Sequence, residues 1–375
     1  MTDANPDILP AGLFDLLPPR AEHAARLTNS AMAVLSSHGY DRVAPPLIEY
    51  ERSLALRMQG TGRQHLFRMV DPASMRTLAI RSDITVQVGR VATTLMASAA
   101  RPLRLSYAGQ VLRIAADQLN PERERLQIGA ELIGHDNVAA AQEVLRIAIE
   151  ALASAGVTGI SVDLTLPDLV DTLADTTFPI DRQTIDTVRR ELDMKDAGAL
   201  AALGADAYLP LLYATGPFDA AIAALAAIDA GGALASRIEA LRAIAADLPG
   251  DVAVTLDPTE RHGFEYQSWF GFSLYADNCA GALGRGGTYA IPDGQGGHEV
   301  ATGFSLYPDA LLDLGEGDNR QPPANILFLP LGYDRAVAAR LRAIGWRTVA
   351  AISEGDDAQA LGCTHRLDGS EIVLL

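Results

Sequence analysis

The order in which helical and strand patterns follow one another limits this chain to few folds. Segments 103–113 and 126–134 both have the composition of strands, and the polar stretch between them predicts a hairpin loop that pairs them. Apolar residues at helical spacing predict one long helix before this hairpin, at 20–38, and another after it, at 137–155. This order is typical of an α+β fold and disfavours the strict alternation of a doubly wound sheet.

The composition changes several times along the chain and predicts five parts. Residues 1–164 contain the first group of helices and strands, and residues 165–250 have alanine-rich patterns that predict an all-helical insertion. Strand patterns return over 251–314, which we expect to complete the core begun by the first part. Residues 315–324 are rich in Gly, Pro and polar residues and predict a linker. Residues 325–375 predict a small α/β unit, near the lower size limit for independent stability.

The composition also disfavours several classes of protein. No apolar run among the 375 residues approaches the roughly 20 that a membrane helix needs, and the first residues lack the pattern of a secretory signal. Two cysteines are too few for a disulfide framework, so we expect a cytoplasmic protein. The net charge of −17 disfavours a chain whose main role is to bind nucleic acid. Lys195 is the only lysine, which excludes a Walker A site, and we expect neither a metal site nor a cofactor.

Several motifs resemble those of class II aminoacyl-tRNA synthetases, and of histidyl-tRNA synthetase in particular. The helix 20–38 with the segment up to Pro46 resembles motif 1, the dimerisation element, and the hairpin 104–134 resembles motif 2. Four shorter matches follow in the expected order: R-S-D-I-T at 81–85, G-F-E-Y-Q at 263–267, G-G-T-Y at 286–289, and A-T-G-F-S-L at 301–306, which resembles the strand of motif 3. The resemblance covers residues 8–314 and implies an antiparallel sheet flanked by helices.

Four polar residues match the family's ligands for the amino group of histidine: Asp83, Thr85, Gln127 and Glu131. An ammonium group requires carboxylates and neutral acceptors at close range. Gln127 and Glu131 lie four residues apart on one strand and point to the same face, and Gly129 between them leaves room for a ligand backbone. In the alternative interpretation, Glu131 pairs with an arginine inside the fold.

The side of this pocket that would hold the imidazole ring matches the family less well. Tyr266 and Tyr289 align with family tyrosines, whereas the second tyrosine of the family's Y-Y pair is replaced by Gln267. A glutamine can still exchange a hydrogen bond with a ring nitrogen. Single aromatic residues in strands are also common in hydrophobic cores, so a packing role for the two tyrosines remains an alternative.

The residues that the family uses to form an adenylate are incomplete. This reaction places charge on the α-phosphate and needs fixed cations and donors there. Arg113 matches the motif 2 arginine and is a remnant of the ATP site, but the glutamate position two residues later is Ala115. The motif 3 arginine is replaced by Ala310, and the arginine of the histidine-specific motif aligns with His262. Loss of one charge clamp lowers the rate by ~10²–10³, so we expect no catalytic residues.

A synthetase-like chain of this length, with an eroded motif 3 and a short tail, resembles the regulatory subunits of ATP phosphoribosyltransferase. The resemblance implies a non-catalytic role in the first step of histidine biosynthesis, with L-histidine as the feedback effector. It also implies a complex with the short-form catalytic subunit of that enzyme and self-dimerisation through the motif 1 region. We expect no tRNA binding, because residues 325–375 are too few for the family's anticodon-binding domain. We also expect no membrane contact, because no apolar run is long enough for a membrane helix.

Three other functions are compatible with the same fold. A divergent histidyl-tRNA synthetase is disfavoured by Ala115, by Ala310 and by the short tail. Another synthetase paralogue could adenylate an amino acid for a different carrier, but it would need the missing ATP arginine. A paralogue that senses histidine for a kinase is disfavoured because no kinase domain is attached.

Overall fold

The computed structural model describes residues 9–56, 58, 66–114, 122–229, 231–261, 267–277, 279–293, 296–312 and 325–375. It divides the chain into two compact units, residues 1–313 and 314–375. The first unit is built on a sheet that has nine strands among the described residues. In spatial order these are β1 (Asp41–Arg42), β5 (Leu103–Leu112), β6 (Glu124–Ile133), β12 (His298–Leu306), β11 (Gly284–Pro292), β10 (Gln267–Ala276), β7 (Ile160–Thr165), β9 (Ala253–Leu256) and β8 (Gly216–Pro217).

The centre of this sheet is antiparallel, as the sequence predicts. β5 and β6 form one long hairpin in which Tyr107 pairs with Gly129, and β6 continues into β12, β11, β10 and β7 through antiparallel neighbours. Two pairs outside this centre are parallel, namely β1 with β5 and β7 with β9. The predicted α+β class with an antiparallel sheet flanked by helices is therefore confirmed, with parallel pairs added on either side of the antiparallel strands.

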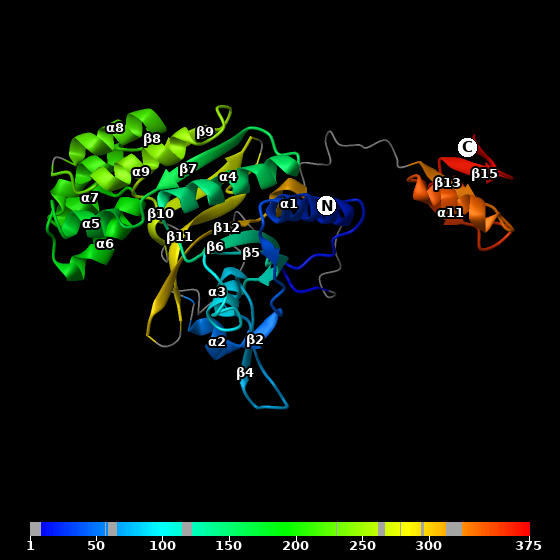
Figure 1. Cartoon of the computed structure of the whole chain (residues 1–375), viewed down its shortest axis with the longest axis horizontal. Helices are drawn as coiled ribbons and strands as arrows, with labels where there is room; N and C mark the ends of the chain where they lie inside the picture. The colour runs from blue at the N-terminus through cyan, green and yellow to red at the C-terminus, as the bar shows by residue number, and fades with distance from the viewer. Residues whose placement is uncertain are drawn as a thin grey trace. The chain divides into compact units, whose positions relative to one another are not determined.

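Three helices cover one face of the sheet: α1 (Arg20–Ser37), α4 (Val138–Ser154) and α9 (Ala235–Ala246). Both predicted long helices are confirmed (Figure 1). Helix α4 starts where the side chain of Asn137 accepts a hydrogen bond from the Ala140 amide, and α1 is followed by Gly39 at φ 78°.

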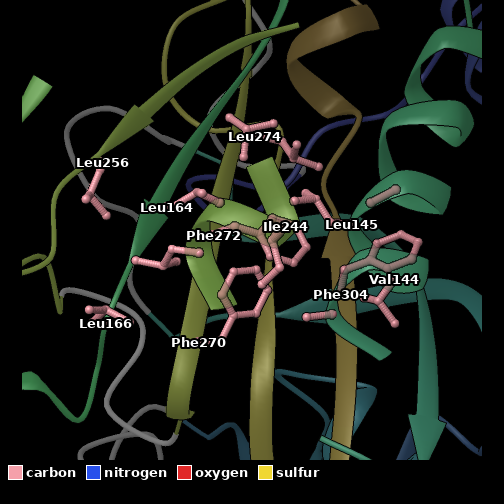
Figure 2. Close-up of a cluster of buried hydrophobic side chains, with 14 of the residues drawn as sticks. Val144, Leu145, Leu164, Leu166, Ile244, Leu256, Phe270, Phe272, Leu274 and Phe304 are labelled. Atoms are coloured by element: carbon pink, nitrogen blue, oxygen red, sulfur yellow. The ribbon is translucent and has the colours of Figure 1, made fainter. Parts of the chain in front are cut away.

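The main hydrophobic core lies between these helices and the sheet. Figure 2 shows Phe270, Phe272 and Phe304 of the sheet gathered against Val144 and Leu145 of α4. On β6 the even-numbered residues from 128 to 132 belong to this core, so the odd-numbered residues face the other side.

The opposite face is covered in part by α3 (Thr85–Thr93), which packs Ile84 and Val88 on Leu105 and Ile291. At the start of this helix the Thr85 amide donates to Asp83 Oδ1 at 2.9 Å. A smaller sheet and a short helix complete this side of the unit. These elements are β2 (Ile48–Tyr50), β4 (Thr77–Ile80), β3 (Arg68–Val70) and α2 (Glu51–Ala55).

The insertion between β7 and β9 consists mostly of helices, and α9 is the last of them. The others are α5 (Leu169–Ala174), α6 (Arg182–Asp193), α7 (Ala197–Ala202), the 3₁₀ helix η2 (Asp206–Tyr213) and α8 (Phe218–Ile228). The prediction of an all-helical insertion is wrong in one respect, because β8 lies within it and pairs with β9. Lys195 links the insertion to the segment after β9, with its Nζ atom 2.6 Å from Asp257 Oδ2.

The second unit has four strands in the order β14-β13-β15-β16 beside one helix among its described residues. Their bounds are β13 (Ile326–Leu329), α11 (Arg335–Ala343), β14 (Arg347–Ala350), β15 (His365–Asp368) and β16 (Glu371–Leu374). The sequence predicted a small α/β unit here, and the structure has one helix and four strands of four residues each among the described residues. The predicted linker 315–324 lies outside the described residues.

Across the described ranges, no helix is long and apolar enough to span a bilayer.

Candidate ligand-binding site

Glycines on neighbouring strands leave part of the polar face of the sheet without side chains. Gly303 of β12 pairs with Glu131 of β6 on one side and with Gly287 of β11 on the other. A Cβ atom at Gly303 would overlap the Glu131 carboxyl group, and one at Gly287 would overlap the Gln267 amide group. The bare backbone of these two glycines therefore makes room for two polar side chains, one from β6 and one from β10, the strands that flank β12 and β11.

Glu131 is the centre of a buried polar network. Its side chain is enclosed, with 1% of the residue exposed, and its two oxygens accept hydrogen bonds from two tyrosines. Tyr107 Oη donates to Oε1 at 3.0 Å, and Tyr289 Oη donates to Oε2 at 2.7 Å. No lysine, arginine or histidine of the described residues pairs with this carboxyl group, so the alternative of an internal ion pair with arginine is wrong for this part of the chain.

The other residues predicted to bind an amino group lie in the same network. The Gln127 amide nitrogen donates to Asp83 Oδ1 at 2.7 Å and to Ser305 Oγ at 2.8 Å, while Thr85 Oγ1 lies 2.9 Å from Tyr107 Oη. Asp83 lies just before α3 and Thr85 is its first residue, whereas Gln127 lies on β6. We call this set the Glu131 network; its members are Asp83, Thr85, Tyr107, Gln127, Glu131, Tyr289 and Ser305.

Burial controls the acid–base properties of the network. Desolvation raises the pKa of Glu131 to about 8, although the tyrosine hydroxyl groups act in the opposite direction, and the nearby charge of Asp83 raises it further. Burial also raises the pKa of Tyr107 well above its ordinary value. Near neutral pH the carboxyl group of Glu131 is therefore mostly protonated in this closed arrangement.

The sequence did not identify Tyr107 and Ser305 as members of the site. Both residues are register partners of Gly129, Tyr107 on β5 and Ser305 on β12. The strand register would therefore have placed them beside Gln127 and Glu131. The expectation that Gly129 leaves room for a ligand is wrong in this structure, because the Tyr107 hydroxyl group occupies the space beside it.

The predicted imidazole side is partly described. Tyr289 donates to Glu131, and Tyr266 lies outside the described residues. The amide oxygen of Gln267 is buried over Gly287 and has no hydrogen-bond partner within the described ranges. A buried acceptor without a donor is unfavourable by roughly 1–3 kcal/mol, so this atom is a potential partner for an N–H group of a ligand.

The side that matches the family's ATP site has Ala310 in place of one expected arginine and keeps Arg113. Arg113 follows β5 and takes no part in the hydrogen bonds of the Glu131 network. Ala310 packs against the hydrophobic core, and the preceding Asp309 lies 3.5 Å from the guanidinium group of Arg125. Where the family has the motif 3 arginine, this chain therefore has the methyl group of Ala310, and the carboxyl group of Asp309 precedes it. The other two substituted positions, 115 and 262, lie outside the described residues.

Comparisons with known proteins define the class. Residues 12–311 match the family model of histidyl-tRNA synthetase. A solved structure of an ATP phosphoribosyltransferase regulatory subunit/histidyl-tRNA synthetase from Bacillus halodurans superimposes with a TM-score of 0.81 at 23% identity, covering 96% of this chain and 97% of that one. Histidyl-tRNA synthetase from Nostoc sp. PCC 7120 gives 0.75 at 15% identity, covering 96% and 90%. The fold is that of the class II histidyl-tRNA synthetases.

Relatives with higher identity define the particular protein family. The ATP phosphoribosyltransferase regulatory subunit of Paramagnetospirillum magneticum is 44% identical, covering 99% of this chain and 98% of the relative. The corresponding subunit of Rhodospirillum centenum is 43% identical, covering 97% and 95%. The chain belongs to the family of ATP phosphoribosyltransferase regulatory subunits and is a non-catalytic subunit.

The raised pKa of Glu131 predicts how stability depends on pH. Between the ordinary value of 4.5 and about 8, the folded chain holds a proton that the unfolded chain has lost, so this group makes folding less favourable as pH rises. Glu131→Gln removes the titration, and the free energy of unfolding of wild type should fall relative to the variant between pH 5.5 and 8. Urea unfolding of both proteins across this range measures the difference. Glu239→Gln changes an exposed position of α9, and its free energy of unfolding should depend on pH as that of wild type does. The same pH dependence for Glu131→Gln would contradict the prediction.

Proposed function

We propose that this chain binds the short-form catalytic subunit of ATP phosphoribosyltransferase and transmits a histidine signal to it, in the first step of histidine biosynthesis. In this complex the catalytic subunit joins ATP to phosphoribosyl pyrophosphate. The observation that carries the proposal is the 44% identity to a regulatory subunit over 99% of the chain, which includes the second unit as well as the synthetase-like core.

The Glu131 network supports L-histidine as the ligand. It places one carboxyl group at the centre and a second, Asp83, at its edge, together with the neutral oxygens of Thr85 and Ser305. These groups are acceptors for an ammonium group. Charge-assisted hydrogen bonds of this kind are about twice as strong as neutral ones, so an α-amino group is the ligand feature that the network favours.

The imidazole ring would lie toward Gly287. Gly303 and Gly287 are directly paired on neighbouring strands, so the Glu131 carboxyl group and the Gln267 amide group lie over paired positions of the sheet. A ligand with an amino group on Glu131 would present a ring N–H group to the Gln267 oxygen, which has no hydrogen-bond partner among the described residues. Tyr266 remains a proposed member of the same side.

Self-dimerisation through the motif 1 region is part of the proposal. Large apolar side chains are exposed on the segment before α1 and around β2, including Leu17 at 67%, Leu47 at 41% and Ile48 at 39%. Apolar patches of this kind often mark interaction surfaces, and closed two-fold dimers are the commonest oligomers. We propose that a second copy covers this surface and that the assembled complex binds no tRNA and works in the cytoplasm.

A divergent synthetase is the alternative function, and pyrophosphate exchange distinguishes it. We expect the purified chain to show no histidine-dependent exchange of pyrophosphate into ATP, because Ala310 replaces a cation and Asp309 adds a carboxyl group beside it. A histidyl-tRNA synthetase serves as the positive control. Exchange above background that Arg113→Ala abolishes would show that this chain activates histidine itself.

Complex formation tests the partner. Co-expressed with a short-form catalytic subunit, this chain should elute with it as one stable complex and raise its ATP phosphoribosyltransferase activity, because the relatives are regulatory subunits of that enzyme. Size-exclusion chromatography with light scattering and an activity assay measure both properties. Two folded chains that elute separately at micromolar concentration, without any gain in activity, would contradict the partner assignment.

Ligand binding tests the site. L-Histidine should raise the melting temperature of the chain, because a ligand that binds only the folded state stabilises it. Histidinol keeps the amine and the ring and should bind, whereas imidazole-lactate lacks the amine and should bind far more weakly. Glu131→Gln should weaken histidine binding by roughly 1.5–3 kcal/mol, which is about ten- to a hundred-fold. Glu239→Gln is the matched control. Equal affinities in calorimetric titrations of wild type and Glu131→Gln would place any bound histidine elsewhere.

A further inference from the structure

We infer that the Glu131 network captures its ligand by ion exchange, in which the ammonium group of the ligand replaces a proton that Glu131 carries in the free chain. The inference rests on the proposed histidine site and concerns how that site is charged before and after binding. It follows from the groups that surround the carboxyl group.

The first observation is that Glu131 is enclosed without a counter-ion. The residue is 1% exposed, its two carboxyl oxygens accept hydrogen bonds from two tyrosine hydroxyl groups, and the Thr85 hydroxyl group also acts on it as a donor. A lone carboxylate in such surroundings is strongly unfavourable, and a buried acid without a cation takes up a proton instead.

The second observation concerns the elements packed around it. The segment before α3 contributes the Asp83 carboxyl group, α3 contributes the Thr85 hydroxyl group, and β12 contributes Gly303 and Ser305. Tyr107 of β5 and Tyr289 of β11 are the remaining titratable neighbours within hydrogen-bond distance. None of these groups is a cation. The hydroxyl donors lower the pKa of Glu131, but burial outweighs them and, together with the charge of Asp83, raises this pKa to about 8.

The third observation is that the network can accommodate the extra proton. A protonated Glu131 donates to one of the two tyrosines, and that tyrosine must then donate to another group. Tyr107 Oη has two such partners, Thr85 Oγ1 at 2.9 Å and Ser305 Oγ at 3.0 Å. The hydroxyl chain can reverse its direction when the proton leaves, because each of these oxygens both donates and accepts.

The exchange balances as one proton for one ammonium group. The free site contains a neutral carboxylic acid; the ligand arrives as R–NH₃⁺, the acid releases H⁺ to solvent, and the product is a carboxylate paired with the ammonium group. A ligand without an amine cannot replace the proton. Since a proton must leave, the affinity should rise with pH below the pKa of Glu131, by about tenfold for each pH unit well below it.

Calorimetry of the full chain with L-histidine tests the exchange. Titrations at pH 7.5 in phosphate and in Tris, which differ in ionisation enthalpy, give the number of protons released on binding. We expect wild type to release most of one proton and its affinity to increase several-fold from pH 6.5 to 7.5. Glu131→Gln, which cannot release this proton, should show a smaller release and a flatter pH profile. Glu239→Gln should behave as wild type.

Infrared difference spectroscopy provides a readout that does not depend on the variant binding histidine. The free wild-type chain should show the carbonyl band of a protonated carboxylic acid, which histidine removes and which is absent from Glu131→Gln. Histidine binding without proton release and without loss of this band would overturn the exchange while leaving the histidine site intact. No histidine binding to wild type would overturn the proposed site, and the exchange with it.

Discussion

The absence of a side chain at Gly303 is the constraint on which the polar site depends. The backbone at this position pairs directly with Glu131, and any Cβ atom there would overlap the carboxyl group. Because the space exists, a carboxyl group can lie enclosed between two tyrosines at the centre of an antiparallel sheet. Its burial in turn disfavours a carboxylate without a counter-ion near neutral pH, because a buried charge is costly unless it is paired. The chemistry of the site therefore follows from one position in the sheet register.

The local patterns were sufficient to predict the framework. The β5–β6 hairpin and the long helices α1 and α4 follow from strand composition and helical spacing, which act over a few positions. The parts that were missed depend on long-range pairing. Tyr107 and Ser305 join the network only because two different strands align with Gly129, and β8 is a strand only because it meets the edge of β9. Single polar residues in strands carry no local sign of which partner they face.

At the motif 3 position a positive charge of the synthetases is missing and a carboxyl group lies next to it. At the position of motif 3 the structure has the Asp309 carboxyl group, paired with Arg125 at 3.5 Å, and the side chain of Ala310 in contact with the core. Burial raises the pKa of Asp309, while Arg125, whose guanidinium group also lies over the Tyr307 ring, lowers it. An arginine that serves a neighbouring carboxyl group is not available to a phosphate. The residues that match the amino-acid side of the family's site form a polar network, whereas Ala310 at the motif 3 position packs on the hydrophobic core.

The parallel pairing of β7 with β9 determines how far the chain could be shortened by engineering. Neighbouring strands that run in the same direction cannot be joined by a tight turn, since the chain must return to the starting edge of the sheet. In this molecule the helical insertion makes that return, and β9 then leads into the segment that Lys195 holds through Asp257. A shortened version of the protein would therefore need a crossover of at least a dozen or so residues and would have to keep α9, which covers the main core. A simple excision would leave β9 without a route to its place in the sheet.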